Sequence, residues 1–205
     1  MAKSFKFRDL QTSAEFAEFS KCYMESFRGK KLNPLQAIKA ETLQSYKRII
    51  GVYQGTHMMA GYIINQYPHR CFEYLTEEEK IKIIDFVGGA NKVCEIVAIW
   101  KSKSISRLTF AFKIWSAIIF DTLKERRPFV FGCSYAGHGM VKRYSILSPK
   151  LVRQGKDDND LNVFYFHRWQ FLMTYLIGIV IVSPREFYRK AARTWLLRKR
   201  VTNEQ

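Results

Sequence analysis

The residues best suited to chemistry gather in one stretch of the chain, Val93 to Leu108, which reads VCEIVAIWKSKSISRL. Its first half alternates apolar residues around a single carboxylate, Glu95, and predicts a strand. A carboxylate on an otherwise apolar strand must find a partner or shift its pKa upward. Glu95 is therefore a candidate base for proton transfer, and an ion pair that only stabilises the fold is the alternative.

The second half of this stretch is a basic, serine-rich loop that precedes a predicted helix. The first N–H groups of a helix lack partners within the helix, and the helix dipole favours negative charge there. The loop has no glycine that would let its backbone close on a diphosphate, so side chains are expected to approach a single phosphate. A plain basic loop, in which Ser106 only caps the helix, is the alternative. The candidate phosphate-binding residues are Trp100, Lys101, Ser102, Lys103, Ser104, Ser106 and Arg107.

Periodicity predicts the elements that position these residues. Residues 5–10 alternate like a first strand, and aromatic residues recur at helical spacing up to residue 27, with Ser13 as the expected N-cap. Residues 48–67 form two apolar runs about a glycine-containing turn, which predicts an antiparallel hairpin. Residues 75–87 are expected to be helical, with Thr76 as N-cap.

The strand that holds Glu95 leads into a strand, helix, strand unit. The helix is expected over residues 107–127, because Pro128 ends it, and the following strand covers residues 129–136. Phe110, Ile114 and Ala117 make one side of the helix partly apolar, so most of its surface is expected to be covered. The main apolar stripe consists of Leu108, Ala111, Phe112, Trp115, Ile118, Ile119 and Leu123. Residues 150–155 and 161–168 flank a polar turn as a closing hairpin.

Composition sets the class of the protein and of its partners. Hydrophobic residues make up 47% of the 205 residues, which describes one packed domain rather than a disordered chain. Thirty-four lysines and arginines against eighteen acidic residues give a net charge of +16, which predicts attraction to an anionic partner. The four cysteines have no metal-ligand spacing and are expected to be reduced, and no signal peptide is recognised, so a cytoplasmic location is expected.

The order of these elements resembles the GNAT superfamily of N-acyltransferases over about residues 5 to 168. The resemblance implies a mixed α/β (α+β) fold, with a central twisted mixed sheet flanked by helices. It also implies that the strand before the long helix splays from its neighbour to admit a pantetheine arm. In most of the superfamily a glycine loop, Q/R-x-x-G-x-G/A, binds the pyrophosphate of acetyl-coenzyme A, and residues 101–107 depart from that pattern.

The departure is shared by superfamily members that take acyl groups from acyl carrier protein. Acyl-homoserine-lactone synthases and N-acyl amino acid synthases also lack the glycine loop, and the former carry a Glu in a pattern like E-[IL]-S-R-[FL]. Glu95 sits at that place, although Ala98 stands where the pattern has Arg. Acyl carrier protein is acidic and presents one phosphate, which suits a protein of charge +16. The resemblance thus implies an acyl-phosphopantetheine thioester as cofactor (acyl carrier protein, or acyl-coenzyme A), an amine acceptor and no metal.

Two further candidates take part in the implied acyl transfer, which needs a proton acceptor and a donor to the departing thiolate. Tyr144 matches the place where many GNAT enzymes hold a tyrosine that protonates the thiolate, and a packing tyrosine is the alternative. His138, between Gly137 and Gly139, is a second candidate base because its ordinary pKa lies near neutrality.

Residues 169–205 extend beyond the implied acyltransferase domain of residues 1–168. They combine an apolar run, too short for the roughly 20 residues of a membrane span, with a basic amphipathic helix that contains Trp195. This pattern predicts peripheral association with an anionic membrane surface at the inner face, and packing of the tail into the core is the alternative.

Three classes of function stay open from the sequence. The first is an acyltransferase acting on an amine. The second is a GNAT-fold binding or regulatory protein without catalysis, which the missing glycine loop favours. The third is a nucleic-acid-binding module, which the charge permits, but the basic residues are scattered and match no DNA- or RNA-binding motif.

Overall fold

The structure is a computed structural model that describes residues 4–27, 38–135, 150–156 and 160–177. In chain order the elements are β1 (Phe5–Asp9), α1 (Ser13–Ser26), α2 (Ala40–Leu43), β2 (Arg48–Gln54), β3 (His57–Asn65), η2 (Arg70–Tyr74), α3 (Glu77–Val87), η3 (Ala90–Lys92), β4 (Val93–Lys101), α4 (Arg107–Thr109), η4 (Phe110–Ile114), α5 (Trp115–Lys124), β5 (Phe129–Tyr135), β6 (Lys150–Arg153), β7 (Leu161–His167) and α7 (Arg168–Ile177).

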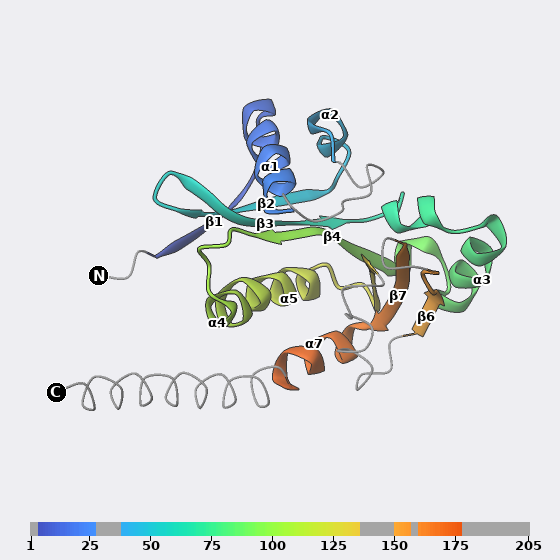
Figure 1. The fold of residues 1–205 in the computed structure, drawn as a ribbon. Helices are drawn as coiled ribbons and strands as arrows, with labels where there is room; N and C mark the ends of the chain where they lie inside the picture. Colours follow the sequence, from blue (N-terminus) through green and yellow to red (C-terminus); the bar gives the residue numbers. More distant parts are fainter. Residues whose placement is uncertain (1–3, 28–37, 136–149, 157–159, 178–205) are drawn as a thin grey trace, which may run out of the picture.

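One seven-stranded sheet in the order β1-β2-β3-β4-β5-β7-β6 runs through the described part of the chain. The β4–β5 pair is parallel and the other neighbouring pairs are antiparallel. Helices α1 and α2 lie on one face of the sheet, and α4, α5 and α7 lie on the other (Figure 1). The expected mixed sheet flanked by helices is confirmed, as are the β2–β3 hairpin and the strand, helix, strand unit from β4 to β5.

Short-range capping signals define two of the helices. Thr76 caps α3 as expected: its hydroxyl accepts from the N–H of Glu79, whose carboxylate accepts from the N–H of Thr76. The expected cap of α1 was wrong by one residue, because Thr12 rather than Ser13 is the N-cap. Glu15 lies three residues after Thr12, so this pair forms the reciprocal capping box.

The long helix between β4 and β5 departs from its expected stripe. Its second segment, η4, is a π-helix, which adds one residue to a turn and shifts the phase of the residues around it. Phe112, expected on the main stripe, is 38% exposed, whereas Ile114, on the partly apolar other side, is fully buried. The buried face of α5 then follows the prediction through Ile118 and Ile119.

Two hydrophobic cores lie on the two faces of the sheet. The core beneath α1, α2 and α3 includes Phe19, Val97 and Trp100. The core beneath α5 and α7 includes Ile118 and Phe164. Because strand residues alternate between faces, Glu95 lies on the α1 face together with Val97. Among the described residues, no helix combines the length and the apolar character that crossing a bilayer requires.

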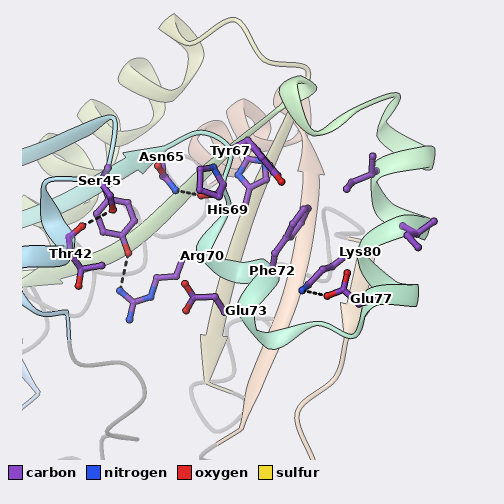
Figure 2. A pocket seen from close by; sticks show the side chains of 14 residues that line it. Thr42, Ser45, Asn65, Tyr67, His69, Arg70, Phe72, Glu73, Glu77 and Lys80 are labelled. Carbon is purple, nitrogen blue, oxygen red and sulfur yellow. Dashed lines mark hydrogen bonds and ion pairs between the residues drawn. The ribbon is translucent and has the colours of Figure 1, made fainter.

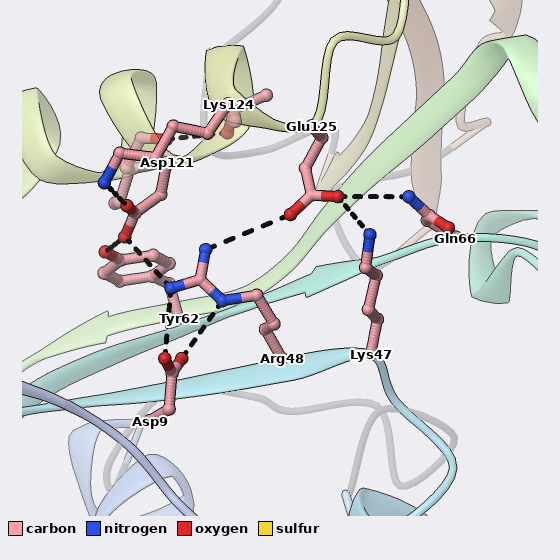
Figure 3. Close-up of polar contacts among 10 residues, drawn as sticks. Asp9, Lys47, Arg48, Tyr62, Gln66, Asp121, Lys124 and Glu125 are labelled. Carbon is pink, nitrogen blue, oxygen red and sulfur yellow. Dashed lines mark hydrogen bonds and ion pairs between the residues drawn. The ribbon is translucent and has the colours of Figure 1, made fainter.

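A network of charged side chains ties the first three strands to α5 (Figure 3). Arg48 of β2 contacts three carboxylates: Asp9 at 3.1 Å, Asp121 at 3.9 Å and Glu125 at 3.9 Å. The hydroxyl of Tyr62 on β3 donates to Asp121 at 2.7 Å. Lys47 and Gln66 also donate to Glu125, and Lys124 pairs with Asp121.

Candidate functional site

Strands β4 and β5 separate in the middle of the sheet. Their pairing runs from Val93 opposite Phe129 to Ile96 opposite Gly132 and then stops. Beyond that point β4 stays paired with β3 as far as Lys101, and β5 stays paired with β7 as far as Tyr135. Each strand therefore keeps its outer neighbour while losing its inner one, which opens the sheet between them. The splayed strand that the family resemblance implied is present.

The backbone of β4 is irregular at the same place. Ile63 pairs with Val97 and Gly61 with Trp100, so two residues of β4 lie opposite one residue of β3. The bulge includes Ala98, whose φ of 52° lies in the left-handed region. A residue other than glycine pays about 1 kcal/mol or more for that conformation, and bulges leave a backbone group outside the ladder. Such features collect beside functional sites, and this one borders the opening.

The basic loop follows β4 and leads into α4. Ser106 caps the helix, since its hydroxyl accepts from the N–H of Thr109 at 3.0 Å. Ser102 and Ser104 share a hydrogen bond of 2.8 Å, and Ser102 continues the β3 ladder through its N–H to Met59. Lys101 turns inward and donates to the carbonyl of Ile105 at 2.8 Å.

Of the two remaining basic residues of the loop, only Lys103 has a described side chain. Lys103 is exposed and points to solvent, where an anionic partner can reach it. Arg107 begins α4, and the position of its side chain lies outside the described part of the structure. The loop therefore presents Lys103 and the first turn of a helix, while Lys101 stabilises the loop itself.

Trp100 lies away from this loop, in the core beneath α1. Its ring is 4% exposed and packs edge-on against Phe19 with centroids 5.9 Å apart. It crosses β3 directly over Gly61, where an added Cβ would come within 2.8 Å of the indole nitrogen. Its indole N–H is buried and has no hydrogen-bond partner among the described residues.

Glu95 is fully buried, and its carboxylate collects three N–H donors. The N–H groups of Arg70 and Cys71, at the start of η2, donate to its two oxygens, the first at 2.8 Å. The side-chain amide of Asn65 donates from β3 at 3.2 Å. The carboxylate thus holds the segment that follows β3 against β4. No cation forms an ion pair with it among the described residues.

His69 precedes this held segment and lies on the same side of the sheet. Its ring is 3% exposed, and its Nε2 lies 3.2 Å from the carbonyl oxygen of Ala90. Burial lowers the pKa of His69, and the attraction of the Glu95 carboxylate opposes that shift without cancelling it. The ring also contacts Phe131, the residue opposite Glu95 in the β4–β5 ladder, with centroids 5.8 Å apart.

A pocket of about 420 Å³ opens beside these residues (Figure 2). Arg70 lines it and donates to the hydroxyl of Tyr46 at 3.1 Å, and Lys80 pairs with Glu77 at 2.6 Å. One part of the wall is therefore polar and charged, and another part is aromatic or aliphatic. The lining residues are Thr42, Ser45, Tyr46, Asn65, Tyr67, Pro68, His69, Arg70, Phe72, Glu73, Glu77, Lys80, Ile81 and Ile84.

The structure brings only part of the predicted site together. Glu95 lies beside the last paired residues of β4 and β5, and the loop of residues 102–106 lies at the far end of β4. Tyr144 and His138 lie outside the described residues and stay predictions. Sequence analysis missed His69 and the pocket, because no local spacing relates His69 to Glu95. The only sequence signal was a histidine directly after Tyr-Pro at the end of an apolar strand.

Comparison with known proteins adds structural relatives. No family model and no curated protein matches this chain by sequence. Among solved structures it is similar to FeeM, an N-acyl amino acid synthase from uncultured soil microbes, with a TM-score of 0.66, 11% identity, and coverage of 88% of this chain and 99% of FeeM.

Two more structures extend the comparison. The AHL synthase LasI matches with a TM-score of 0.53 and 8% identity, over 82% of this chain and 91% of LasI. A GNAT family acetyltransferase from Listeria monocytogenes matches with a TM-score of 0.53 and 11% identity, over 80% of this chain and 94% of its own. At such identities the likeness concerns the fold. The seven-stranded sheet, the separated central strands and these matches together show that the chain has the fold of the GNAT superfamily of N-acyltransferases.

Proposed function

We propose that this protein is an N-acyltransferase that moves an acyl group from a phosphopantetheine thioester to an amine. The observation that carries the proposal is the opening between β4 and β5 beyond Ile96 and Gly132. Helix α4 lies on one side of the sheet, and α2 lies on the other (Figure 1). The lining of the pocket includes Thr42 of α2. In this proposal a thioester arm enters from the α4 side and meets an amine held in the pocket.

The reaction needs few groups once the two substrates meet. The amine nitrogen attacks the thioester carbonyl, a C–N bond forms, and the C–S bond breaks. The nitrogen loses a proton, and the departing thiolate gains one. The bulge at Ala98 supports this role, because a backbone group released from the ladder can donate to the carbonyl oxygen as negative charge develops on it.

We favour acyl carrier protein over coenzyme A as the source of the thioester. The loop after β4 has no glycine, Lys103 is exposed beside the helix start, and the net charge is +16. Such a surface attracts an acidic carrier that presents one phosphate. The fold shared with FeeM and LasI is consistent with this choice.

The test uses purified full-length protein with dodecanoyl-acyl carrier protein or dodecanoyl-coenzyme A as donor. A mixture of the common amino acids serves as acceptor, and mass spectrometry detects the amide. Lys103→Glu is expected to raise KM for the carrier at least several-fold and to change KM for the coenzyme A donor less, because only the carrier adds an acidic surface. Lys6→Glu is the matched control, since it makes the same charge change on exposed β1.

The outcomes separate the candidate functions. Amide formation supports the acyltransferase, and a lower KM with the carrier supports the carrier as donor. Tight binding of the acyl carrier without amide formation would favour a GNAT-fold binding protein instead. Equal KM values for the two donors, with no effect of Lys103→Glu, would remove the carrier from the proposal.

We also propose that the C-terminal region places the protein on an anionic membrane surface. On α7, Trp169, Met173 and Leu176 are 55%, 47% and 45% exposed, and their spacing puts them on one stripe of the helix. The chain continues from this helix into residues 178–205, which include the basic amphipathic stretch seen in the sequence. An exposed apolar stripe followed in the sequence by a basic amphipathic stretch has the composition of a membrane-interfacial segment.

Vesicle binding tests the membrane proposal. Binding is expected to increase when phosphatidylglycerol is added to phosphatidylcholine vesicles and to decrease with salt. Trp169→Ser should weaken it by about 1.5 kcal/mol, roughly tenfold, through lost apolar burial. Phe7→Ser, which removes a similarly exposed aromatic side chain from β1, is the control. Equal binding to neutral and anionic vesicles, unaffected by Trp169→Ser, would contradict the proposal.

A further inference from the structure

The two ring nitrogens of His69 have different surroundings. Nε2 faces the carbonyl oxygen of Ala90 at 3.2 Å. A carbonyl oxygen only accepts hydrogen bonds, so Nε2 must carry the hydrogen of that bond. In the neutral ring the lone pair then resides on Nδ1. Nδ1 is buried and has no hydrogen-bond partner among the described residues.

An unpartnered nitrogen in a fold this well packed calls for an explanation, because a buried polar atom without a partner costs about 1 to 3 kcal/mol. The ring lines the pocket and is otherwise enclosed by aromatic rings. Tyr67 and Phe72 contact it on the η2 side, with centroids 6.0 and 5.0 Å away, and Phe131 contacts it from β5. These contacts fix the orientation of the ring at the wall of the pocket, with Nδ1 beneath the surface.

Electrostatics keep this ring neutral yet able to take a proton. Burial lowers the pKa of His69, so the ring is an unprotonated acceptor near neutral pH. The Glu95 carboxylate is the charged group that opposes this shift, and it would stabilise the imidazolium once formed. Of the other titratable neighbours, Tyr67 contacts the ring, and Arg70 directs its guanidinium to Tyr46.

His69 lies near the opening between β4 and β5. Phe131, which its ring contacts, pairs with Glu95, and the next pair along the ladder is the last one before β4 and β5 separate. Glu95 in turn accepts the N–H groups of Arg70 and Cys71, the two residues after His69. The buried carboxylate thereby sets the place of the imidazole next to the opening.

We propose that Nδ1 of His69 is the general base that accepts the proton of the attacking amine, and that Glu95 is the positioning residue that holds and stabilises it. This inference rests on the acyl transfer proposed above. As the C–N bond forms and the C–S bond breaks, the amine proton passes to Nδ1. The thiolate takes a proton from water, and the imidazolium returns its proton to water, so the enzyme ends unchanged.

The test substitutes His69→Gln in the full-length protein. Glutamine can keep a side-chain N–H toward Ala90 but offers no basic nitrogen. With dodecanoyl-acyl carrier protein and the amino acid mixture at pH 7, kcat is expected to fall at least about 100-fold, the usual loss of a general base, with KM for the donor little changed. The rate of the variant should then rise steeply with pH as the amine loses its proton unaided. His57→Gln, at an exposed hairpin position, is the control.

Nitrogen-15 NMR of the histidine side chains supplies a readout that needs no substrate. We expect the signals lost in His69→Gln to show a neutral ring protonated at Nε2 in the wild-type protein at pH 7. If His69→Gln forms the amide at the wild-type rate, the inference about His69 is wrong, while the proposed acyl transfer stands. A ring protonated at Nδ1 at pH 7 would overturn it as well. An inactive wild-type protein would instead overturn the proposed function, and the base with it.

Discussion

Two clusters of polar side chains join elements of this fold, one where β2 and β3 meet α5 and one where η2 meets β4. In the first, Arg48 stands among three carboxylates, and Tyr62, Lys47 and Gln66 supply further donors (Figure 3). In the second, Glu95 is held by neutral N–H donors, and the imidazole of His69 keeps one nitrogen unpaired.

The difference separates a cluster that holds the fold from one that can react. In the first cluster the charges pair with one another and have no free group for a substrate. Removing one of them should therefore lower the free energy of unfolding without changing the rate of acyl transfer. A buried lone pair without a partner lowers stability but can take a proton. Glu95 has both roles, because it holds η2 and stabilises a charge that forms on His69.

The largest effect on stability is expected from Glu95→Gln. The substitution keeps the shape of the side chain but turns one acceptor oxygen into an NH₂ group that faces backbone donors. We expect the free energy of unfolding to fall by about 3 kcal/mol, because buried N–H groups lose a charged acceptor. Urea denaturation followed by circular dichroism measures the change. A loss below about 0.5 kcal/mol would mean that the carboxylate does not hold η2.

Arg48→Met should have the next largest effect, and only on stability. Its side chain is 27% exposed, so we discount the value of its ion pairs and expect a loss of about 2 kcal/mol. Amide formation should stay at the wild-type level. Lys124→Met removes a 71% exposed partner from the same Asp121 and should cost less than about 0.5 kcal/mol. Equal losses in the free energy of unfolding would show that burial of Arg48 does not strengthen its ion pairs.

Tyr62→Phe tests one donor of the same network. The ring is fully buried, and only its hydroxyl bond to Asp121 disappears, so the free energy of unfolding should fall by about 1.5 kcal/mol. Tyr53→Phe, whose hydroxyl lies 3.4 Å from Glu18, is the comparison and should cost less. Chemical denaturation of both variants gives the difference. A larger loss in Tyr53→Phe would contradict the ranking.

The smallest effect concerns the pH dependence of stability. The pKa of His69 is lowered in the folded protein, so the unfolded chain binds the proton more readily as the pH falls below about 6.5. The stability linked to this group is present above that pH and is lost below it. The free energy of unfolding, measured by denaturation at several pH values between about pH 7.5 and pH 5, should therefore depend less on pH in His69→Gln than in the wild-type protein. An unchanged slope would mean that His69 has the same pKa in both states, and His57→Gln should keep the wild-type slope.

Local signals determined the elements of this protein. Thr76 and Glu79 stand three residues apart, and a capping box needs nothing from the rest of the chain. The β2–β3 hairpin follows from two apolar runs around Gly55, whose φ of 66° suits a turn. The apolar alternation around Glu95 places a carboxylate on a buried strand and depends on no tertiary contact. Such features depend on neighbours a few residues away, so the sequence by itself specifies them.

Tertiary structure decided how those elements make a site. Because of the π-helical segment at Phe110–Ile114, Ile114 is buried and Phe112 is exposed. The hydrophobic periodicity of the sequence does not predict an extra residue in a helical turn. The partner of Glu95 was not a cation but the N–H groups of Arg70 and Cys71, far away in the chain. Buried donors and acceptors pair according to distance in space, and the chain meets that demand only after the sheet has formed. The free nitrogen of His69 is a product of that closure.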